Sequence, residues 1–87
     1  MDIVLQKRFS KQYKKLPTAI QLKFLERVAM LVTSPFDPRL NIHRLHGELL
    51  AFQSMNITGD YRALFVADEE LSTITFFKIG THIELYG

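Results

Sequence analysis

Residues 50–80, LAFQSMNITGDYRALFVADEELSTITFFKIG, decide the fold, because three segments of strand character follow one another there with only short turns between them. The segments are residues 50–58, 61–67 and 72–79. Alternation in the first segment places Met55 and Ile57 on one face of its strand. The turn sequences Thr-Gly-Asp and Asp-Glu-Glu separate the segments. Strands joined so closely are expected to pair as antiparallel neighbours.

Upstream of these strands the sequence predicts one more strand and two helices. Residues 2–6 form a short apolar run typical of a strand. Ser10 is placed to cap a short helix that Pro17 ends. Thr18 is a candidate cap for a second helix that runs to about Val32 and carries a broad apolar stripe.

The order of these elements is β-α-α-β-β-β, without a repeat or a linker. It predicts an α+β fold of two layers in a single domain over residues 1–87. The sheet is expected to be antiparallel, with the helical hairpin packed on one face. The other face of the sheet would then be partly free to carry a site.

The composition excludes several classes of protein. The chain has 87 residues and no cysteine, which removes a disulfide framework, a thiolate nucleophile and a cysteine-based zinc site. The longest stretch without charge, residues 49–59, is too short to cross a membrane. The N-terminus lacks the basic-then-apolar order of a signal peptide. We therefore expect a cytoplasmic protein that has no contact with a membrane.

The net charge of +2 conceals an uneven distribution. Residues 1–27 hold seven basic and two acidic side chains, a balance of +5, whereas residues 28–87 have a balance of −3. The basic residues of the first part are Lys7, Arg8, Lys11, Lys14, Lys15, Lys23 and Arg27. Such a segment is either a surface that attracts a polyanion or simply a solvated helix face.

Seven polar side chains with chemical potential fall in the strand region, its turns and its loops, and none of them falls in the two predicted helices. They are His43, His46, Asn56, Asp60, Arg62, His82 and Tyr86. A ribonuclease without a metal needs a base, an acid and a cation for the phosphate. Histidine suits proton transfer, Asp60 suits a base, Arg62 suits a phosphate clamp and Tyr86 suits base stacking.

Each of these residues also has an ordinary structural interpretation. Asp60 is a common turn former, and Arg62 can pair with a surface carboxylate. His46 can be a solvent-facing turn residue, and Tyr86 can anchor the tail on the sheet. The separation of the histidines along the chain does not match the spacing of metal ligands, so neither a metal nor another cofactor is expected.

Three motifs resemble one family. Residues 79–86, IGTHIELY, resemble the C-terminal signature I-G-T-H-x-x-L-Y of the RelE/YafQ group of bacterial toxin–antitoxin ribonucleases. Residues 43–47, HRLHG, are similar to the H-x-L-x-G sequence that leads into the sheet of this family. Residues 54–62, SMNITGDYR, are similar to its S-x-R-I-x-x-x-Y-R hairpin. The order of the preceding strand and helices agrees as well, so the resemblance covers the whole chain.

The resemblance implies a role for each candidate residue. His82 matches the histidine proposed as general acid in the YafQ branch, and Tyr86 matches an aromatic residue that positions the substrate. Asp60 matches an acidic residue proposed as base, and His43 an upstream histidine of the site. Arg62 matches the arginine that stabilises charge on the scissile phosphate in the RelE branch.

The resemblance further implies a RelE-like two-layer fold, in which the first strand lies beside the last. It also implies a toxin that cleaves mRNA on the ribosome. In this reaction the RNA's own 2′-hydroxyl is the nucleophile. The implied partners are the ribosome with its mRNA and a small cognate antitoxin. Ribosomal RNA would be held by the basic residues Lys7, Lys11, Lys14, Lys15 and Lys23.

Two alternatives stay open at this point. The same fold serves ParE-type toxins, which poison DNA gyrase. The second alternative is a catalytically weak toxin that acts only as the partner of its antitoxin. Asn56 bears on the second, because many relatives have Arg, Lys or His at its position.

Overall fold

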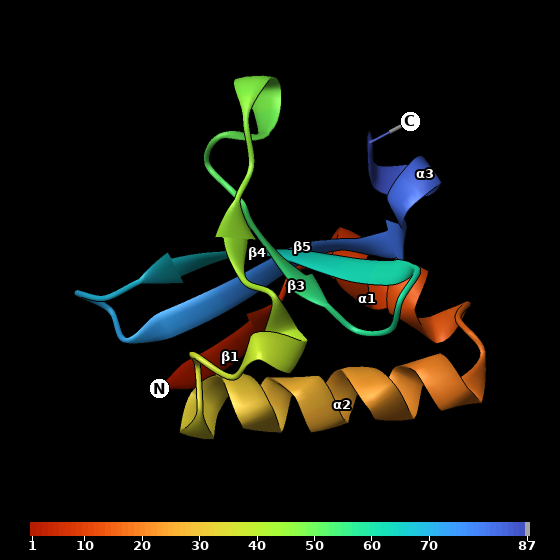
Figure 1. Ribbon diagram of the computed structural model, residues 1–87, viewed down its shortest axis with the longest axis horizontal. Helices are drawn as coiled ribbons and strands as arrows, with labels where there is room; N and C mark the ends of the chain where they lie inside the picture. Colours follow the sequence, from red (N-terminus) through yellow and green to blue (C-terminus); the bar gives the residue numbers. More distant parts are fainter. Residues whose placement is uncertain (87) are drawn as a thin grey trace.

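Five strands form one sheet in the order β1-β5-β4-β3-β2 (Figure 1). The computed structural model describes residues 1–86, and Gly87, the last residue of the predicted domain, lies outside them. The strands are β1 (Asp2–Leu5), β2 (His43–Arg44), β3 (Gln53–Asn56), β4 (Tyr61–Asp68) and β5 (Thr73–Thr81). The predicted antiparallel neighbours are confirmed, since β3 pairs with β4 and β4 with β5 in antiparallel fashion.

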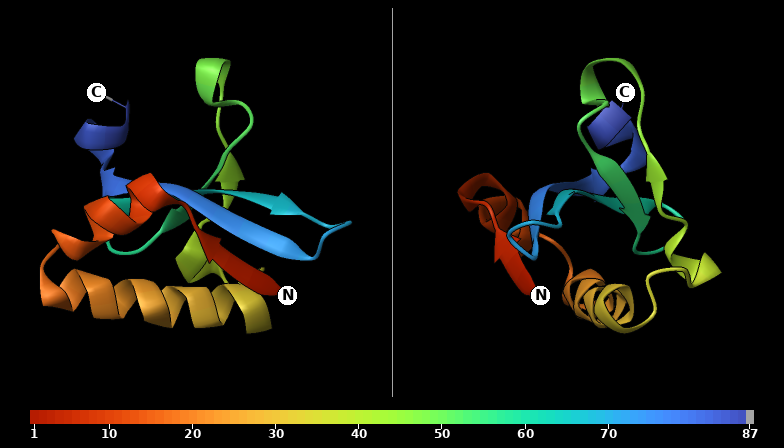
Figure 2. Two further views of the ribbon diagram at one scale, coloured as in Figure 1. Left: turned by 180° about the vertical axis from the view of Figure 1, so that it is seen from behind. Right: turned by 90° about the vertical axis from the view of Figure 1, so that its left-hand side faces the viewer.

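The helical elements lie on both sides of this sheet. They are α1 (Lys7–Lys14), α2 (Thr18–Thr33), α3 (His82–Tyr86) and the short 3₁₀ turns η1 (Pro38–Leu40) and η2 (Gly47–Leu49). Figure 2 shows the α1–α2 hairpin on one side and both α3 and the η2 loop rising on the other. The α+β fold with two layers and a helical hairpin on one face is therefore confirmed. Within residues 1–86, no helix is long and apolar enough to cross a membrane.

The sheet is mixed, so the prediction of a wholly antiparallel sheet is wrong for its first strand. β1 runs parallel to β5, with Asp2 beside Thr73 and Leu5 beside Phe76. Parallel neighbours need a long connection, and the rest of the domain supplies it here. The periodicity of residues 2–6 contains no signal of strand direction. The implied neighbourhood of the first and last strands is confirmed.

Two predicted boundaries are also wrong. The first helix begins at Lys7 instead of Ser10, because the Ser10 N–H already donates to the Gln6 carbonyl at 2.9 Å. The strand expected over residues 50–58 is only β3, because η2 and its flanking turn occupy the chain before it. The second helix begins at Thr18, but its N-cap position is Pro17, so the prediction of Thr18 as the cap is wrong.

Aromatic rings from both layers meet in the core. Phe76 of β5 lies 5.1 Å from Phe24 of α2, 5.6 Å from Phe9 of α1 and 5.5 Å from Phe65 of β4, measured between ring centroids. All four side chains are 2% exposed or less. Tilted aromatic contacts of this kind add to the free energy gained by burying apolar area. Phe76 therefore joins the sheet to both helices.

The buried stripe of α2 is narrower than the sequence predicted. Phe24 and Leu31 are buried, and Met55 and Ile57, which alternation places on one face, are both 0% exposed. Val32, at the far end of the predicted stripe, is 47% exposed. A helix on one face of a sheet buries only the side turned toward it.

Hydrogen bonds fix the helical hairpin to itself and to the sheet. The Tyr13 hydroxyl donates to the Gln21 carbonyl at 2.9 Å, and the Gln21 amide donates back to the Tyr13 carbonyl at 3.1 Å. The Gln12 side chain accepts the Ile79 N–H at 3.1 Å. This last bond ties α1 to the part of β5 that leads into the C-terminal helix.

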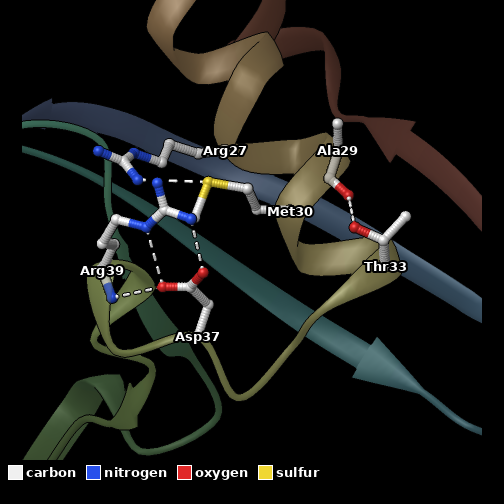
Figure 3. A network of polar contacts seen from close by, with 6 residues as sticks. All are labelled: Arg27, Ala29, Met30, Thr33, Asp37 and Arg39. Atoms are coloured by element: carbon white, nitrogen blue, oxygen red, sulfur yellow. Dashed lines mark hydrogen bonds and ion pairs between the residues drawn. The ribbon is translucent and has the colours of Figure 1, made fainter.

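Polar contacts also shape the connection from α2 to β2 (Figure 3). Asp37 caps η1 by accepting the Arg39 N–H at 2.9 Å, and it holds the Arg39 guanidinium at 3.1 and 2.8 Å. These bonds lower the pKa of Asp37 to about 2. Arg27 donates to Met30 Sδ at 3.3 Å and to the Ile57 carbonyl at 3.3 Å. The chain then leaves η1 through Asn41, in the left-handed conformation with φ 45°.

A capping box starts α3. The Thr81 hydroxyl accepts the Glu84 N–H at 3.2 Å, and the Glu84 carboxylate accepts the Thr81 N–H at 2.8 Å. The bond from the Thr81 backbone, followed by that from its side chain, lowers the pKa of Glu84. A Cβ at position 80 would lie 3.2 Å from the Glu84 carboxylate, so Gly80 leaves the room that this cap needs.

We predict that Phe76→Ala lowers the free energy of unfolding by about 3–5 kcal/mol, because it removes a fully buried ring and leaves a cavity between three other rings. Equilibrium denaturation with urea measures the change. Phe36→Ala is the matched control, since Phe36 is 96% exposed, and its effect should stay within about 0.5 kcal/mol. Equal losses for the two variants would contradict this account of the core.

We also predict that α3 loosens in acid. A carboxyl whose pKa is lowered by folding contributes stability above its ordinary pKa and loses it as the pH falls through the folded value. The capping bond of Glu84 should therefore weaken as the pH falls below the ordinary range of a glutamate carboxyl. An NMR titration would follow the Thr81 amide resonance. Glu84→Gln keeps an acceptor without a charge, so an equal titration of Thr81 in this variant would contradict the assignment.

Candidate functional site

A hollow of about 390 Å³ lies among β2, β4 and α3. Its lining residues are Asn41, His43, Leu45, Arg62, His82 and Tyr86. Four of the five predicted catalytic residues are thus brought to one cavity from three parts of the chain. Asp60, the fifth, is not part of its lining.

His43 is positioned by β2 and by the turn before it. It pairs with Ser54 of β3, which is 0% exposed, so the backbone of this short edge strand is held on the sheet. Nδ1 of the exposed His43 ring lies 2.9 Å from the Asn41 carbonyl oxygen. The ring thus has a defined partner on one nitrogen.

Arg62 lies on β4, opposite Gly80 of β5 and Asn56 of β3. Its Nη1 donates to the carbonyls of Thr58, Gly59 and Tyr61 at 3.0, 3.1 and 3.2 Å. Within residues 1–86 it makes no ion pair with a carboxylate, the partner that the ordinary interpretation expected. The turn carbonyls therefore hold one end of the guanidinium.

His82 and Tyr86 lie on α3, contrary to the expectation that no candidate residue is helical. The reason is the capping box at residues 81–84, which starts a helix that the sequence reasoning did not identify. One helical turn separates the two rings, whose centroids are 4.7 Å apart at an interplanar angle of 69°. The Tyr86 hydroxyl donates to Ser54 Oγ at 3.1 Å. Tyr86 therefore anchors α3 on β3 while it also lines the hollow.

Asp60 occupies the exposed turn between β3 and β4. Its backbone N–H lies 3.3 Å from Thr58 Oγ1, which also accepts the Tyr61 N–H at 3.1 Å. The Asp60 carbonyl accepts the His82 N–H at 3.2 Å. Asp60 thus forms the turn, as its ordinary interpretation predicted, and its backbone contacts the helix that carries His82.

Sequence reasoning missed three residues of this region. Asn41 and Leu45 line the hollow, and the buried Ser54 supports Tyr86. The sequence signal for Asn41 is limited to its residue type, because asparagine adopts the left-handed conformation more readily than most residues. Asn56, the departure from the family pattern, has a buried Oδ1 for which residues 1–86 provide no hydrogen-bond partner.

The predicted basic residues of α1 lie on its exposed surface. Lys7, Lys11, Lys14 and Lys15 are all exposed, whereas Lys23 of α2 is half-buried and 3.5 Å from Glu26. Two more cations extend this surface. Arg8 and Lys78 line a depression with Lys15 and Glu84, and so connect α1 to the start of α3.

Two further observations complete the survey of candidate sites. A larger hollow of about 660 Å³ is lined mainly by apolar side chains from the end of α2, the connection over residues 35–42 and the sheet. It contains none of the predicted catalytic residues. No group of three His, Cys, Asp or Glu side chains within residues 1–86 is arranged to hold a metal ion.

Neither a family model nor a curated protein matches the chain. Solved structures do. The toxin–antitoxin complex RelBE2 of Mycobacterium tuberculosis contains a chain that is 23% identical, with a TM-score of 0.77 over 93% of this chain and 96% of that one. A YoeB/ParE toxin from Agrobacterium tumefaciens is 15% identical, with a TM-score of 0.78 over 94% of this chain and 99% of that one.

YafQ from E. coli is similar over nearly the whole length. It is 20% identical, with a TM-score of 0.73 over 99% of this chain and 98% of that one. At identities this low, the comparisons establish similarity of fold. The similarity includes the helical hairpin and the C-terminal helix, because almost the entire chain is matched. The chain has the fold of the RelE, YafQ and YoeB/ParE toxins.

Proposed function

We propose that this protein is a ribosome-dependent mRNA endonuclease, the toxin of a toxin–antitoxin system. The observation that carries the proposal is the single hollow that gathers His43, Arg62, His82 and Tyr86. The fold shared with RelE and YafQ toxins supports it, and so does the toxin–antitoxin complex in which the RelBE2 chain was solved. The activity belongs in the cytoplasm, where ribosomes translate.

The proposed reaction is attack of an RNA 2′-hydroxyl on the adjacent phosphate, with the 5′-oxygen of the next nucleotide as leaving group. His82 donates a proton to this leaving oxygen, since an imidazole can be protonated near neutral pH and still release its proton. Tyr86 offers an aromatic face for a base. Its ring lies against His82, so a stacked nucleotide would be held beside the acid.

Arg62 stabilises the charge that develops on the phosphate. Only its Nη1 is engaged with the turn carbonyls, and within residues 1–86 neither Nε nor Nη2 makes a hydrogen bond. Two donors of a guanidinium fork match two phosphate oxygens. The carbonyl bonds at 3.0–3.2 Å fix the fork in advance, which lowers the cost of ordering it when the phosphate binds.

Two residues are candidates for the base that accepts the 2′-hydroxyl proton. Asp60 has the appropriate chemistry and is suggested by the resemblance. His43 lines the hollow, which Asp60 does not. The reaction needs only one of them.

The basic surface of α1 is proposed to bind ribosomal RNA. Attraction of lysines to phosphates is long-range and does not depend on sequence. Arg8 and Lys78 continue this surface to the foot of α3. Ribosomal RNA bound there would lie on the side of the molecule next to the hollow, so mRNA in the ribosome could reach the catalytic side chains.

We predict that His82→Ala relieves the translation arrest caused by expression of the protein in bacteria, and that it lowers mRNA cleavage by about 100-fold or more. Mapping of mRNA 5′ ends after induction measures cleavage. His46→Ala is the matched control, because His46 is exposed and outside the hollow, and it should arrest translation like the wild type.

Two results would contradict the proposed function. DNA damage with intact mRNA would indicate a gyrase poison of the ParE type. Absence of any effect on growth would indicate a toxin that serves only as the partner of its antitoxin. Full toxicity and full cleavage in His82→Ala, Arg62→Ala and the double variant would instead remove these residues from the site.

We further predict that reversing the charge of Lys11, Lys14 and Lys15 to Glu weakens ribosome binding and leaves the fold intact, because all three side chains are exposed. Co-sedimentation with ribosomes across a salt titration measures binding, and circular dichroism measures the fold. Wild-type affinity should fall as salt rises, with a shallower slope for the variant. Identical slopes would exclude α1 as the electrostatic contact.

A further inference from the structure

The helix α3 borders two separate concavities. His82 and Tyr86 line the hollow, whereas Glu84 and Leu85 line a depression of about 420 Å³. The remaining walls of the depression come from α1 with the turn that follows it, and from β4 and β5. No residue lines both concavities. The depression is therefore a second site, to which the proposed reaction assigns no ligand.

The depression is basic. Its lining includes three cations, Arg8, Lys15 and Lys78. In the described part of the chain, residues 1–86, none of the three makes an ion pair with an acidic side chain. The one carboxylate of the lining, Glu84, is engaged, since it accepts the Thr81 N–H at 2.8 Å. Cations that converge on a concave surface attract an anion more strongly than the same cations on a flat one.

Gln12 adds a neutral donor with a fixed orientation. β1 pairs with β5 only as far as Phe76, and beyond this point Gln12 Oε1 accepts the Ile79 N–H at 3.1 Å. This bond fixes the amide group at the wall of the depression. Among residues 1–86, the Nε2 atom of Gln12 has no hydrogen-bond acceptor, so it is free to donate to a ligand.

The rest of the lining is apolar or aromatic. Leu16, Pro17, Ile79 and Leu85 contribute aliphatic surface, and Tyr61 contributes a half-buried ring. Aromatic rings stack on nucleobases with little dependence on the base. The volume lies within the range of sites that bind small molecules and cofactors. An inorganic phosphate would leave this wall unused, whereas a phosphate joined to a nucleoside matches both parts of the lining.

We infer that the depression binds a nucleoside phosphate, with the phosphate held by the cations and Gln12 and the base placed against Tyr61. The inference goes beyond the proposed function, because such binding needs neither a ribosome nor cleavage. A free mononucleotide and one nucleotide of an RNA strand share this chemistry. An acidic peptide would match the cations but leave the aromatic ring without a stacking partner.

The first test is an NMR titration of the ¹⁵N-labelled full-length chain without ribosomes. Adenosine 5′-monophosphate should bind about 10-fold or more tightly than inorganic phosphate or adenosine, because stacking and charge-assisted hydrogen bonds both contribute. The shift changes should centre on Gln12 and Lys78. Equal affinity for inorganic phosphate, equal affinity for a hexaglutamate peptide, or shift changes confined to His43 and His82 would each overturn the inference.

Two adjacent lysines provide a matched pair of variants. Lys14 and Lys15 are both exposed, and a change of either to Gln removes one positive charge, but only Lys15 lines the depression. Affinity for adenosine 5′-monophosphate should fall about 10-fold in Lys15→Gln and by less than about 2-fold in Lys14→Gln. Equal losses would indicate general attraction to α1 and overturn the site.

Gln12→Glu tests the neutral donor. The new carboxylate can still accept the Ile79 N–H, but it replaces the Nε2 donor by an oxygen that repels a phosphate. Affinity should fall about 10-fold or more, with a circular dichroism spectrum like that of the wild type. Wild-type affinity in this variant would overturn the placement of the phosphate.

A single-stranded RNA of eight nucleotides distinguishes the two sources of the ligand. Tighter binding than the mononucleotide, with the same dependence on Lys15, would identify an RNA strand as the ligand, and equal binding would identify the free mononucleotide. If the wild type cuts no mRNA but binds the mononucleotide with this dependence, the proposed function fails while the site stands. Cleavage of mRNA without such binding would overturn the site alone.

Discussion

The register between β4 and β5 is the constraint on which both faces of this protein depend. It places Phe65 beside Phe76 on the side of the helices and Arg62 beside Gly80 near the hollow. A shift of one residue would move every side chain to the opposite face. The register changes once, between Leu64 and Phe65, and such an irregularity redirects the side chains that follow. One strand pair thus builds the apolar core and also aligns the site.

Much of this arrangement could be predicted from local patterns. Alternation placed Met55 and Ile57 on one face of their strand, and both are core residues. The turn sequences identified the antiparallel neighbours. The direction of β1 could not be predicted, because the period of apolar residues is the same in parallel and antiparallel strands. The start of α1 was misplaced because Ser10 has the chemistry of a cap but lies one turn inside the helix.

The candidate site was predicted in part for a related reason. His43, Arg62, His82 and Tyr86 were identified by residue type and resemblance, and the fold brings them to one hollow. What the sequence reasoning lacked was backbone chemistry. The Asn41 carbonyl contacts the His43 ring, and three turn carbonyls accept hydrogen bonds from Arg62. These partners are backbone atoms, so no pattern of side chains reveals them. Thr81 and Glu84 have the spacing of a capping box, and this pattern was a sequence signal for the start of α3.

The helix that carries His82 is too short to be stable alone, since isolated helices of fewer than about 12 residues are marginal in water. α3 has five residues and therefore depends on contacts outside itself. Three independent ones are present: the capping box, the bond from Tyr86 to Ser54 and the bond from the His82 N–H to the Asp60 carbonyl. They join α3 to β5, to β3 and to the turn between β3 and β4. β3 also pairs with His43, and β4, which follows this turn, carries Arg62. The groups proposed to act together are therefore attached to neighbouring elements of one sheet, and this shared support limits how far they can move apart in a domain so small.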